Sequence, residues 1–522
     1  MHSGSWRVGR ASASCSLSRK APSRNAPARE RVGRDVYLIA AAAIVGMLMT
    51  YLDTSIVNVG LQRLSTDLSA PLGTIQWVTT AYLLALAAVI PLSGWATERF
   101  GTKRVWMISL GLFCGGSVLC GFAWSAPSLI GFRAVQGLGG GLILPIGMSV
   151  MAQAAGPGMF GRVSSIMALP VLGGPMLGPL IGGLILTFGS WRWMFFVNVP
   201  VTVVAIAMGI RYLPADPASA RSEAGRLDWL GLVLLCPGLT VLVFGLSETR
   251  AHGGLAYPLA FGPMAAGAAL VVLFALHSVR APRPLLDVRL FRMPGFSAAS
   301  ISVFLAGGAI FGTWLVLPLY FQLGRGLSPL AAGALVMPQA LGVAISSPIA
   351  GRLTDRIGGG RVSVVGALVM TLATVPLALS GSVGLSLPVY CLLLFGRGLG
   401  FGATLMPSMA AAYALLDRAA IPRATSLLTV LQRVGGTVAI TLFAVVLQRQ
   451  LGFLNGVGGG DEGIGGNIAP AERTRVAGQL NDAFAHTWWW VVGMTALAIA
   501  SAAIVARARA RSERVPRPAL AG

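Results

Sequence analysis

Asp53 is the residue whose position most strongly suggests chemistry, because it is the one acid in the apolar stretch MLMTYLDTSIVN at residues 47–58. On insertion scales, a charged side chain at the centre of a membrane-spanning helix costs roughly 2.5 to 3.5 kcal/mol. Such residues usually face the interior of a helix bundle and mark the route of an ion or a proton. The stretch therefore predicts that Asp53 takes up and releases protons, and a structural polar contact between helices is the alternative.

Arg133, in a later apolar stretch, is the predicted partner of Asp53. Each residue lies about six or seven positions from the predicted outer end of its helix, so at 1.5 Å per residue both should lie roughly 10 Å below the outer face. Burial raises the pKa of a carboxyl group, and a nearby guanidinium lowers it. A carboxylate balanced between these effects can bind a proton from one side and release it to the other. The alternative, a static buried ion pair, predicts that loss of either residue mainly damages folding.

The composition indicates the kind of fold that holds these two residues. Of the 522 residues, 55% are hydrophobic and 11% are charged, and the mean hydropathy is +0.76. The apolar residues recur in successive runs of about 20 residues, long enough to cross a bilayer as helices. These runs indicate an all-α polytopic membrane protein and exclude a soluble one.

Fourteen membrane spans are predicted, near residues 36–60, 74–95, 104–123, 127–150, 161–187, 193–211, 228–247, 258–279, 296–321, 329–350, 361–380, 385–411, 424–448 and 484–506. They group into a six-helix bundle at 36–211, a linker with two extra helices at 212–295, and a second six-helix bundle at 296–506. Residues 1–35 are predicted to be a disordered, uncleaved basic tail and residues 507–522 a second tail. The outer loop at 449–483 is predicted to be mobile or to form a short surface helix.

The formal net charge of +22 is explained by membrane topology. Basic residues gather in alternate loops, for example Arg99, Lys103 and Arg104 in the first of them. Loops rich in arginine and lysine stay in the cytoplasm, so both termini should be cytoplasmic, in the inner membrane of a bacterium. Because the charge does not cover one soluble face, no nucleic-acid partner is expected.

A membrane-embedded enzyme is not indicated. The four histidines, His2, His252, His277 and His486, show no spacing typical of a metal site. The sequence contains neither a nucleophile motif nor a nucleotide-binding P-loop. No metal and no cofactor are therefore expected, and the proton gradient is the expected source of energy.

The two predicted bundles repeat each other. GWATERFGTKRV from Gly94 is matched by GRLTDRIGGGRV from Gly351, an offset of 257 (351 minus 94). Residues 137–141 are matched by 398–402 at an offset of 261 (398 minus 137), and Gly173-Gly174 by Gly435-Gly436 at 262 (435 minus 173). The matching loops lie on one side of the membrane, so the repeat is parallel, about an axis along the membrane normal. Small residues alone can make spans look alike, but they do not explain the charged loop.

Over nearly its whole length the chain resembles the major facilitator superfamily, in particular the fourteen-helix drug:proton antiporters. The stretches that carry the resemblance are LDTSIVNVGL at 52–61, GWATERFGTKR at 94–104, LIGFRAVQGLGGG at 129–141, GGPMLGPLIGG at 173–183, WRWMFFVNVP at 191–200 and VLPLYFQLGRGLSPLAAG at 316–333. The resemblance implies two six-helix bundles around a central cavity, with two peripheral helices. It also implies that Arg133 takes part in proton coupling.

Two further sets of residues gain a role through this resemblance. Gly174, Pro175, Gly178, Pro179 and Gly182 are similar to the antiporter motif, although close helix packing alone explains glycines at this spacing. A cytoplasmic gate is implied for Gly94, Glu98, Arg99, Gly101, Asp355 and Arg356, with a plain solvated turn as the alternative. The family usually has Asp where Glu98 stands.

The predicted function is proton-driven export of small amphipathic compounds across the cytoplasmic membrane by alternating access, as in multidrug efflux and antibiotic resistance. Candidate residues for the substrate cavity are Tyr82, Gln136, Gln153, Tyr320, Gln339 and Tyr413. The span at 329–350 has no acid, which disfavours dications as substrates. Export of one endogenous metabolite, uptake by proton symport and a non-transporting sensor remain alternatives. A periplasmic adaptor and an outer-membrane channel remain open as partners, beside substrate, protons and the bilayer.

Overall fold

The computed structural model describes residues 34–155, 163, 174, 178, 181–216, 227–251, 258–327, 329–380, 385–416, 420–450 and 470–512. These residues form helices and connecting turns, without a strand. A helix pairs its own backbone N–H and C=O groups, which is what a chain crossing lipid requires.

Among the described residues of the first half, five long helices and two short ones have defined bounds. They are α1 (Arg34–Asp67), α2 (Leu72–Val89), α3 (Leu92–Phe100), α4 (Thr102–Gly121), α5 (Ala126–Ala155), α8 (Trp193–Phe196) and α9 (Asn198–Tyr212). Residues 181–188 are also helical. The remainder of the predicted span at 161–187 lies outside the described residues, apart from three single positions.

The linker and the second half are also helical. The two extra helices are α11 (Trp229–Ala251) and α12 (Pro258–Arg280), and the second half begins after the short helix η1 (Val288–Arg292). Its helices are α13 (Pro294–Leu319), η2 (Tyr320–Gly324), α14 (Pro329–Ile357), α15 (Gly359–Ala378), α16 (Leu387–Gly402), α17 (Leu405–Tyr413), α18 (Ile421–Gln450) and α19 (Pro470–Ser512).

Twelve helices among the described residues are long and apolar enough to cross a membrane, and a bent pair makes a thirteenth. The prediction of an all-α polytopic membrane protein is confirmed. One predicted span, at 161–187, is missing from this count because it lies mostly outside the described residues. The count is therefore consistent with the fourteen predicted spans.

Two predicted spans are interrupted, and the outer loop is shorter than predicted. The span at 74–95 is bent by 57° between its two helices, where Pro91 lacks the N–H that would continue the helical ladder. The span at 385–411 is split into α16 and α17. Residues 470–483, predicted as part of the loop, are the first turns of α19.

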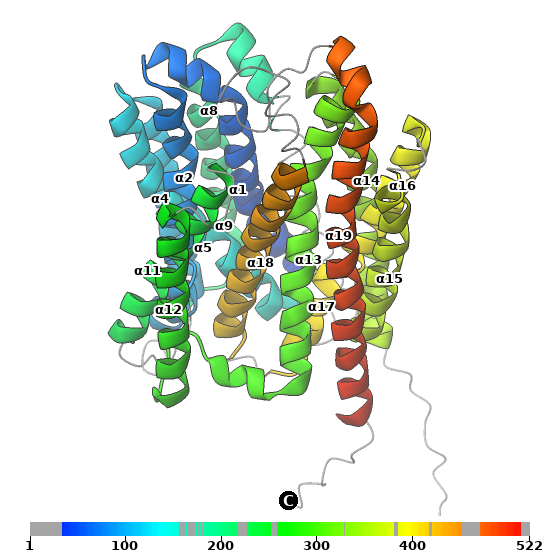
Figure 1. Cartoon of the computed structure of the whole chain (residues 1–522). Coiled ribbons are helices and arrows are strands. Elements are labelled where there is room, and N and C mark those ends of the chain that lie inside the picture. The colour runs from blue at the N-terminus through cyan, green and yellow to red at the C-terminus, as the bar shows by residue number, and fades with distance from the viewer. Residues whose placement is uncertain are drawn as a thin grey trace, which may run out of the picture.

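The helices lie side by side in two groups, with the extra pair against their common flank (Figure 1). α11 packs against α12 and also contacts α2 of the first half and α18 of the second. Thr441 of α18 donates a hydrogen bond to the carbonyl of Leu246 in α11 (3.1 Å), and Trp77 of α2 stacks on Phe244 (5.9 Å between ring centroids). α11 thus joins the two halves along one side.

The repeated loops have the same backbone turn. Gly101 precedes α4 with a φ of +92°, and Gly358 precedes α15 with a φ of +90°. These positions are related by the offset of 257 (358 minus 101). Only glycine adopts this conformation without steric cost, so the repeat in the sequence is also a repeat in the structure.

Candidate functional site: the buried Asp53 network

Asp53 lies on α1 with its carboxylate completely buried in the first half. Arg133 Nη1 of α5 donates a hydrogen bond to Asp53 Oδ2 at 2.6 Å. Two amide groups donate to the other oxygen, Gln136 Nε2 at 2.9 Å and Asn198 Nδ2 at 2.7 Å. The predicted meeting of Asp53 and Arg133 is thus present, and the carboxylate has three donors.

The partners of Asp53 are themselves held in place. Arg133 also donates to Gln136 Oε1 at 2.7 Å and to the carbonyl oxygen of Val78 at 3.2 Å. Ser117 Oγ of α4 accepts hydrogen bonds from Gln136 (2.7 Å) and from Asn198 (3.3 Å). A buried ion pair is stable only when most of its remaining donors and acceptors are satisfied, and in this network Arg133 Nη2 and Asn198 Oδ1 are left without a partner.

Small residues allow the helices to approach closely enough for this network. A Cβ atom at Gly116 of α4 would lie 2.6 Å from Gln136 Cα, and one at Gly139 of α5 would lie 2.5 Å from Phe113 N. Both distances are shorter than any real packing contact. Glycine at these positions lets the backbones of α4 and α5 meet, as small residues commonly do in membrane bundles.

Tyr82 of α2 covers the network. Its ring lies on the guanidinium of Arg133, with Cζ 4.1 Å from the ring centroid. A cation on an aromatic face is attracted by about 0.5 to 2 kcal/mol, more when water is excluded. Tyr82 is completely buried, so its ring does not face an open space.

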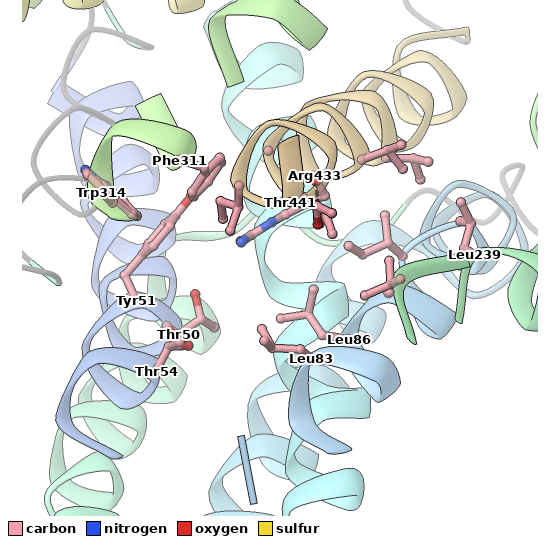
Figure 2. Close-up of a pocket in the computed structure, with 18 of the residues that line it drawn as sticks. Thr50, Tyr51, Thr54, Leu83, Leu86, Leu239, Phe311, Trp314, Arg433 and Thr441 are labelled. Carbon is pink, nitrogen blue, oxygen red and sulfur yellow. Dashed lines mark hydrogen bonds between the residues drawn. The ribbon is translucent and has the colours of Figure 1, made fainter. Parts of the chain in front are cut away.

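A cavity of about 350 Å³ lies on another face of α1, between the two halves (Figure 2). Thr50, Tyr51, Thr54, Ser55 and Asn58 line it, and Asp53 does not. Successive residues of a helix are about 100° apart around its axis, so Asp53 points away from the space that Thr54 faces. One helix therefore carries both the buried carboxylate and part of the cavity wall.

The described glycines of the predicted antiporter motif pack against this same helix. A Cβ atom at Gly174 would overlap the side chain of Tyr51, and one at Gly178 would overlap that of Ser55. A Cβ atom at Gly182 would be in ordinary contact with Ile56, 3.4 Å from its carbonyl oxygen. Close packing is thus present at these positions, while Pro175 and Pro179 lie outside the described residues.

The predicted gate residue Glu98 joins the two halves at the basic end of the molecule, by which we mean the end with the arginine-rich loops. Arg423 of α18 donates two hydrogen bonds to its carboxylate, from Nε to Oε1 at 2.7 Å and from Nη2 to Oε2 at 2.6 Å. Nearby, the hydroxyl groups of Ser93 and Ser426 are 2.7 Å apart. A Cβ atom at Gly94 would be only 3.2 Å from Arg423 Cα, so this end is closed by direct contact.

The other gate residues lie around the two repeated turns. Gly101 supports its turn through a positive φ, Arg99 and Arg356 are exposed, and Asp355 is half-buried. Asp216 of the linker was not predicted to take part, yet its carboxylate accepts from the backbone N–H groups of Lys103 (2.9 Å) and Arg104 (3.1 Å). An acid at the first turn of α4 satisfies unpaired N–H groups and complements the helix dipole.

The second half has a buried arginine of its own. Arg397 of α16 is 1% exposed, and its guanidinium donates to four oxygens. These are Thr374 Oγ1 (3.2 Å), Gln339 Oε1 (3.3 Å), Thr313 Oγ1 (2.5 Å) and the carbonyl oxygen of Ala309 (2.9 Å). No carboxylate of the described residues pairs with it.

The six residues proposed for the cavity wall all lie elsewhere in the structure. Tyr82 and Gln136 belong to the Asp53 network, Gln339 binds Arg397, Tyr320 stacks on Tyr390, Tyr413 is buried and Gln153 is exposed. None of the six lines the cavity between the halves. The larger polar side chains are mostly used inside each half, where buried charges need partners.

Sequence reasoning missed Asn198, Ser117 and the cavity residue Arg433. Asn198 and Ser117 are single polar residues inside apolar runs, and this is the signal that could have identified them. No repeat or motif marks them. The structure places Arg433 in the cavity wall.

Comparisons with known proteins agree on one family. The family model described as Major Facilitator Superfamily matches residues 43–440. The chain is 36% identical over 414 residues to a multidrug resistance protein B homolog of Mycobacterium tuberculosis (strain ATCC 25618 / H37Rv), covering 79% of this chain and 76% of that one. It is 31% identical over 332 residues to the putative multidrug resistance protein MdtD of Salmonella heidelberg, covering 63% and 69%.

A solved structure supports the same fold. The proton:xylose symporter XylE aligns with a TM-score of 0.58 at 17% identity, over 93% of this chain and 97% of that chain. At this identity the likeness concerns the fold alone.

Proposed function

The chain belongs to the major facilitator superfamily, and from this premise we propose that it is a proton-driven exporter of small amphipathic compounds. Relatives named as multidrug resistance proteins support a multidrug transporter. The observation that carries the proton-driven part of the proposal is the fully buried Asp53, held by Arg133, Gln136 and Asn198 on the helix that also lines the cavity.

Proton uptake at Asp53 would change the forces on α1. The ionised carboxylate accepts three charge-assisted or amide hydrogen bonds, while a protonated one attracts the guanidinium of Arg133 far less. Release of Arg133 frees α1 to move relative to α5. Because Thr50, Tyr51 and Thr54 on α1 line the cavity, the same movement reshapes the substrate site.

Export by exchange follows from this coupling. Substrate in the cavity favours the arrangement with Asp53 ionised, and protonation favours the arrangement that releases substrate on the other side. A ligand shifts such an equilibrium only by its difference in affinity for the two states. Competition between proton and substrate for opposite states is therefore sufficient for exchange.

The Glu98–Arg423 pair would act as the latch of one of these states. It closes the basic end between α3 and α18. We place this end in the cytoplasm, since arginine-rich loops stay on that side of a bacterial inner membrane. The arrangement described here would then be the outward-facing one, and return to the inward-facing one would require this pair to separate.

Asp53→Asn tests the proposal in proteoliposomes. We expect exchange driven by a pH gradient to fall by at least tenfold, while substrate counterflow without a gradient continues, because the amide keeps the shape but binds no proton. Asp67→Asn is the matched control, since Asp67 lies on the same helix in an exposed pair with Arg63 and should leave both activities unchanged. Full pH-driven exchange by Asp53→Asn would refute the assignment.

The direction of transport is tested in the same vesicles. If the protein exports by exchange, protons flowing down their gradient should drive substrate uphill in the opposite direction. If it is a symporter, they should drive substrate uphill in the same direction. The absence of counterflow for a panel of amphipathic compounds would favour a sensor or an exporter restricted to one metabolite. A periplasmic adaptor and an outer-membrane channel remain proposed partners.

A further inference from the structure

Arg433 of α18 extends into the cavity between the two halves (Figure 2). Its guanidinium lies beside two aromatic rings, with Cζ 5.6 Å from the ring centroids of both Tyr51 and Phe311. These rings come from α1 and α13. The remaining wall is mostly apolar, and α11 contributes Leu239 and Val243 to it.

The positive charge of Arg433 has no counter-ion among the described residues. Its guanidinium forms no hydrogen bond or ion pair there, and its buried Nε has no partner. None of the residues that line the cavity is Asp or Glu. The sequence from 156 to 180, most of which lies outside the described residues, contains no acid.

The two fully buried arginines of the described residues, Arg133 and Arg397, differ from Arg433 in having protein acceptors, although Arg133 Nη2 has none. Arg133 pairs with Asp53, and Arg397 donates to four oxygens. A guanidinium presents five donors in a rigid, planar fork that matches a carboxylate. A site of this kind without internal acceptors is incomplete until a ligand supplies them.

We propose that Arg433 is the anion-binding group of the cavity, and that the preferred ligands are amphipathic monoanions. Such a ligand would place a carboxylate or an ionised phenol on Arg433, a flat aromatic body against the rings of Tyr51 and Phe311, and its apolar remainder against α11. The proposal rests on the proposed function for the direction of transport, but the binding preference does not depend on it.

The cavity disfavours cations for the same reason that it favours anions. A positively charged ligand would meet Arg433 with no acid to offset the repulsion, in a setting where charges are only weakly screened. A neutral ligand would offer the guanidinium at most an uncharged acceptor, such as an amide carbonyl oxygen, whose hydrogen bond is weaker than that of a carboxylate. The order of affinity should therefore be anion, then neutral compound, then cation.

Equilibrium binding to the purified full-length protein in detergent tests this order. Three probes of one shape are compared at neutral pH, namely naphthaleneacetate, its primary amide and (naphthylmethyl)trimethylammonium. We expect the wild type to bind the carboxylate about tenfold more tightly than the amide, as a charge-assisted hydrogen bond implies. Arg433→Gln should abolish this preference, and Arg433→Lys should keep part of it.

Two further variants separate ligand binding from a structural role. Arg449→Gln is the matched control, because it makes the same change at an exposed position of α18 and should leave the order unchanged. Thr437→Glu keeps Arg433 but adds an acid one helical turn away in the cavity wall, where it can pair with the guanidinium. It should abolish the preference for the carboxylate as Arg433→Gln does, even if Arg433→Gln does not fold.

The outcomes are distinct. A wild type that binds no carboxylate, or binds the amide or the ammonium compound equally well, overturns the inference. So does a preference that survives both Arg433→Gln and Thr437→Glu, since Arg433 would then serve only to hold Tyr51 and Phe311 together. The assay uses no proton gradient, so a charge preference without pH-driven exchange would refute the proposed function alone.

Discussion

Among the described residues, each half fully buries one arginine, at positions that lie about one helical turn apart in the repeat, but only the first half pairs it with a carboxylate. Arg133 binds Asp53, whereas Arg397 donates to hydroxyl, amide and carbonyl oxygens. In the proposed function, the first arrangement changes its charge by taking up a proton. The second holds the positive charge of Arg397 among neutral acceptors. The comparison separates the half that would respond to protons from the half against which it would move.

The repeat shows how the difference is built. Arg397 stands at the position of Gln136 (397 minus 136 gives 261), and its partner Thr374 at the position of Ser117 (374 minus 117 gives 257). Gln339 stands at the position of Tyr82 by the same offset (339 minus 82 gives 257). The polar positions are thus shared by the halves, while their charges have been redistributed.

The largest effect is expected for Arg133→Met. Removal of one partner of a buried pair leaves an unpaired charge and typically costs about 3 to 5 kcal/mol. The loss should shrink as pH falls, because protonation of Asp53 removes that charge. Thermal unfolding in detergent across a pH series measures it. Asp53→Asn combined with Arg133→Met should recover stability but not exchange, and equal losses at all pH values would contradict a titrating pair.

Arg397→Met should have a smaller and different effect. It leaves neutral acceptors unpaired, at about 1 to 3 kcal/mol, and no described carboxylate faces it. The loss of stability should therefore be independent of pH between about 5 and 8, and pH-driven exchange should persist in the folded fraction. The same unfolding series measures it. A pH-dependent loss like that of Arg133→Met would remove the contrast between the halves.

Glu98→Gln should have the smallest effect on stability, because the pair that it weakens is partly exposed, with 22% of each side chain accessible. Exposed pairs contribute about 0.2 to 1 kcal/mol, enough to shift a balance between two states by up to about fivefold. Spin labels on α3 and α18 at the basic end should report more separated halves. Exchanging the charges, Glu98→Arg with Arg423→Glu, should restore the distance. An unchanged distance distribution in Glu98→Gln would mean that the pair is no latch.

The fold and the central pair could be predicted because each depends on local counting. Apolar runs located the spans, and depth along two helices brought Asp53 to Arg133. The repeat located both turns with their glycines. In each case the signal lies within one or two segments of the chain.

The cavity wall could not be predicted in this way, because its residues are decided by packing between distant helices. The spans are apolar all round, so periodicity does not mark the face that lines the cavity. Arg423 lies 325 residues from Glu98, and nothing in either segment names the other. Gln136 and Gln339 were predicted for the cavity wall because they are polar residues in apolar spans. In the structure each accepts a hydrogen bond from the buried arginine of its own half.

The place of α11 bears on how a compound held in the lipid could reach the cavity. This helix fills the flank between α2 and α18 and supplies part of the cavity wall there. A hydrophobic molecule diffusing within the bilayer leaflet cannot slip between these two helices without first displacing a third. On this flank α11 therefore separates the cavity from the lipid, and a compound that enters from the bilayer must do so elsewhere around the protein.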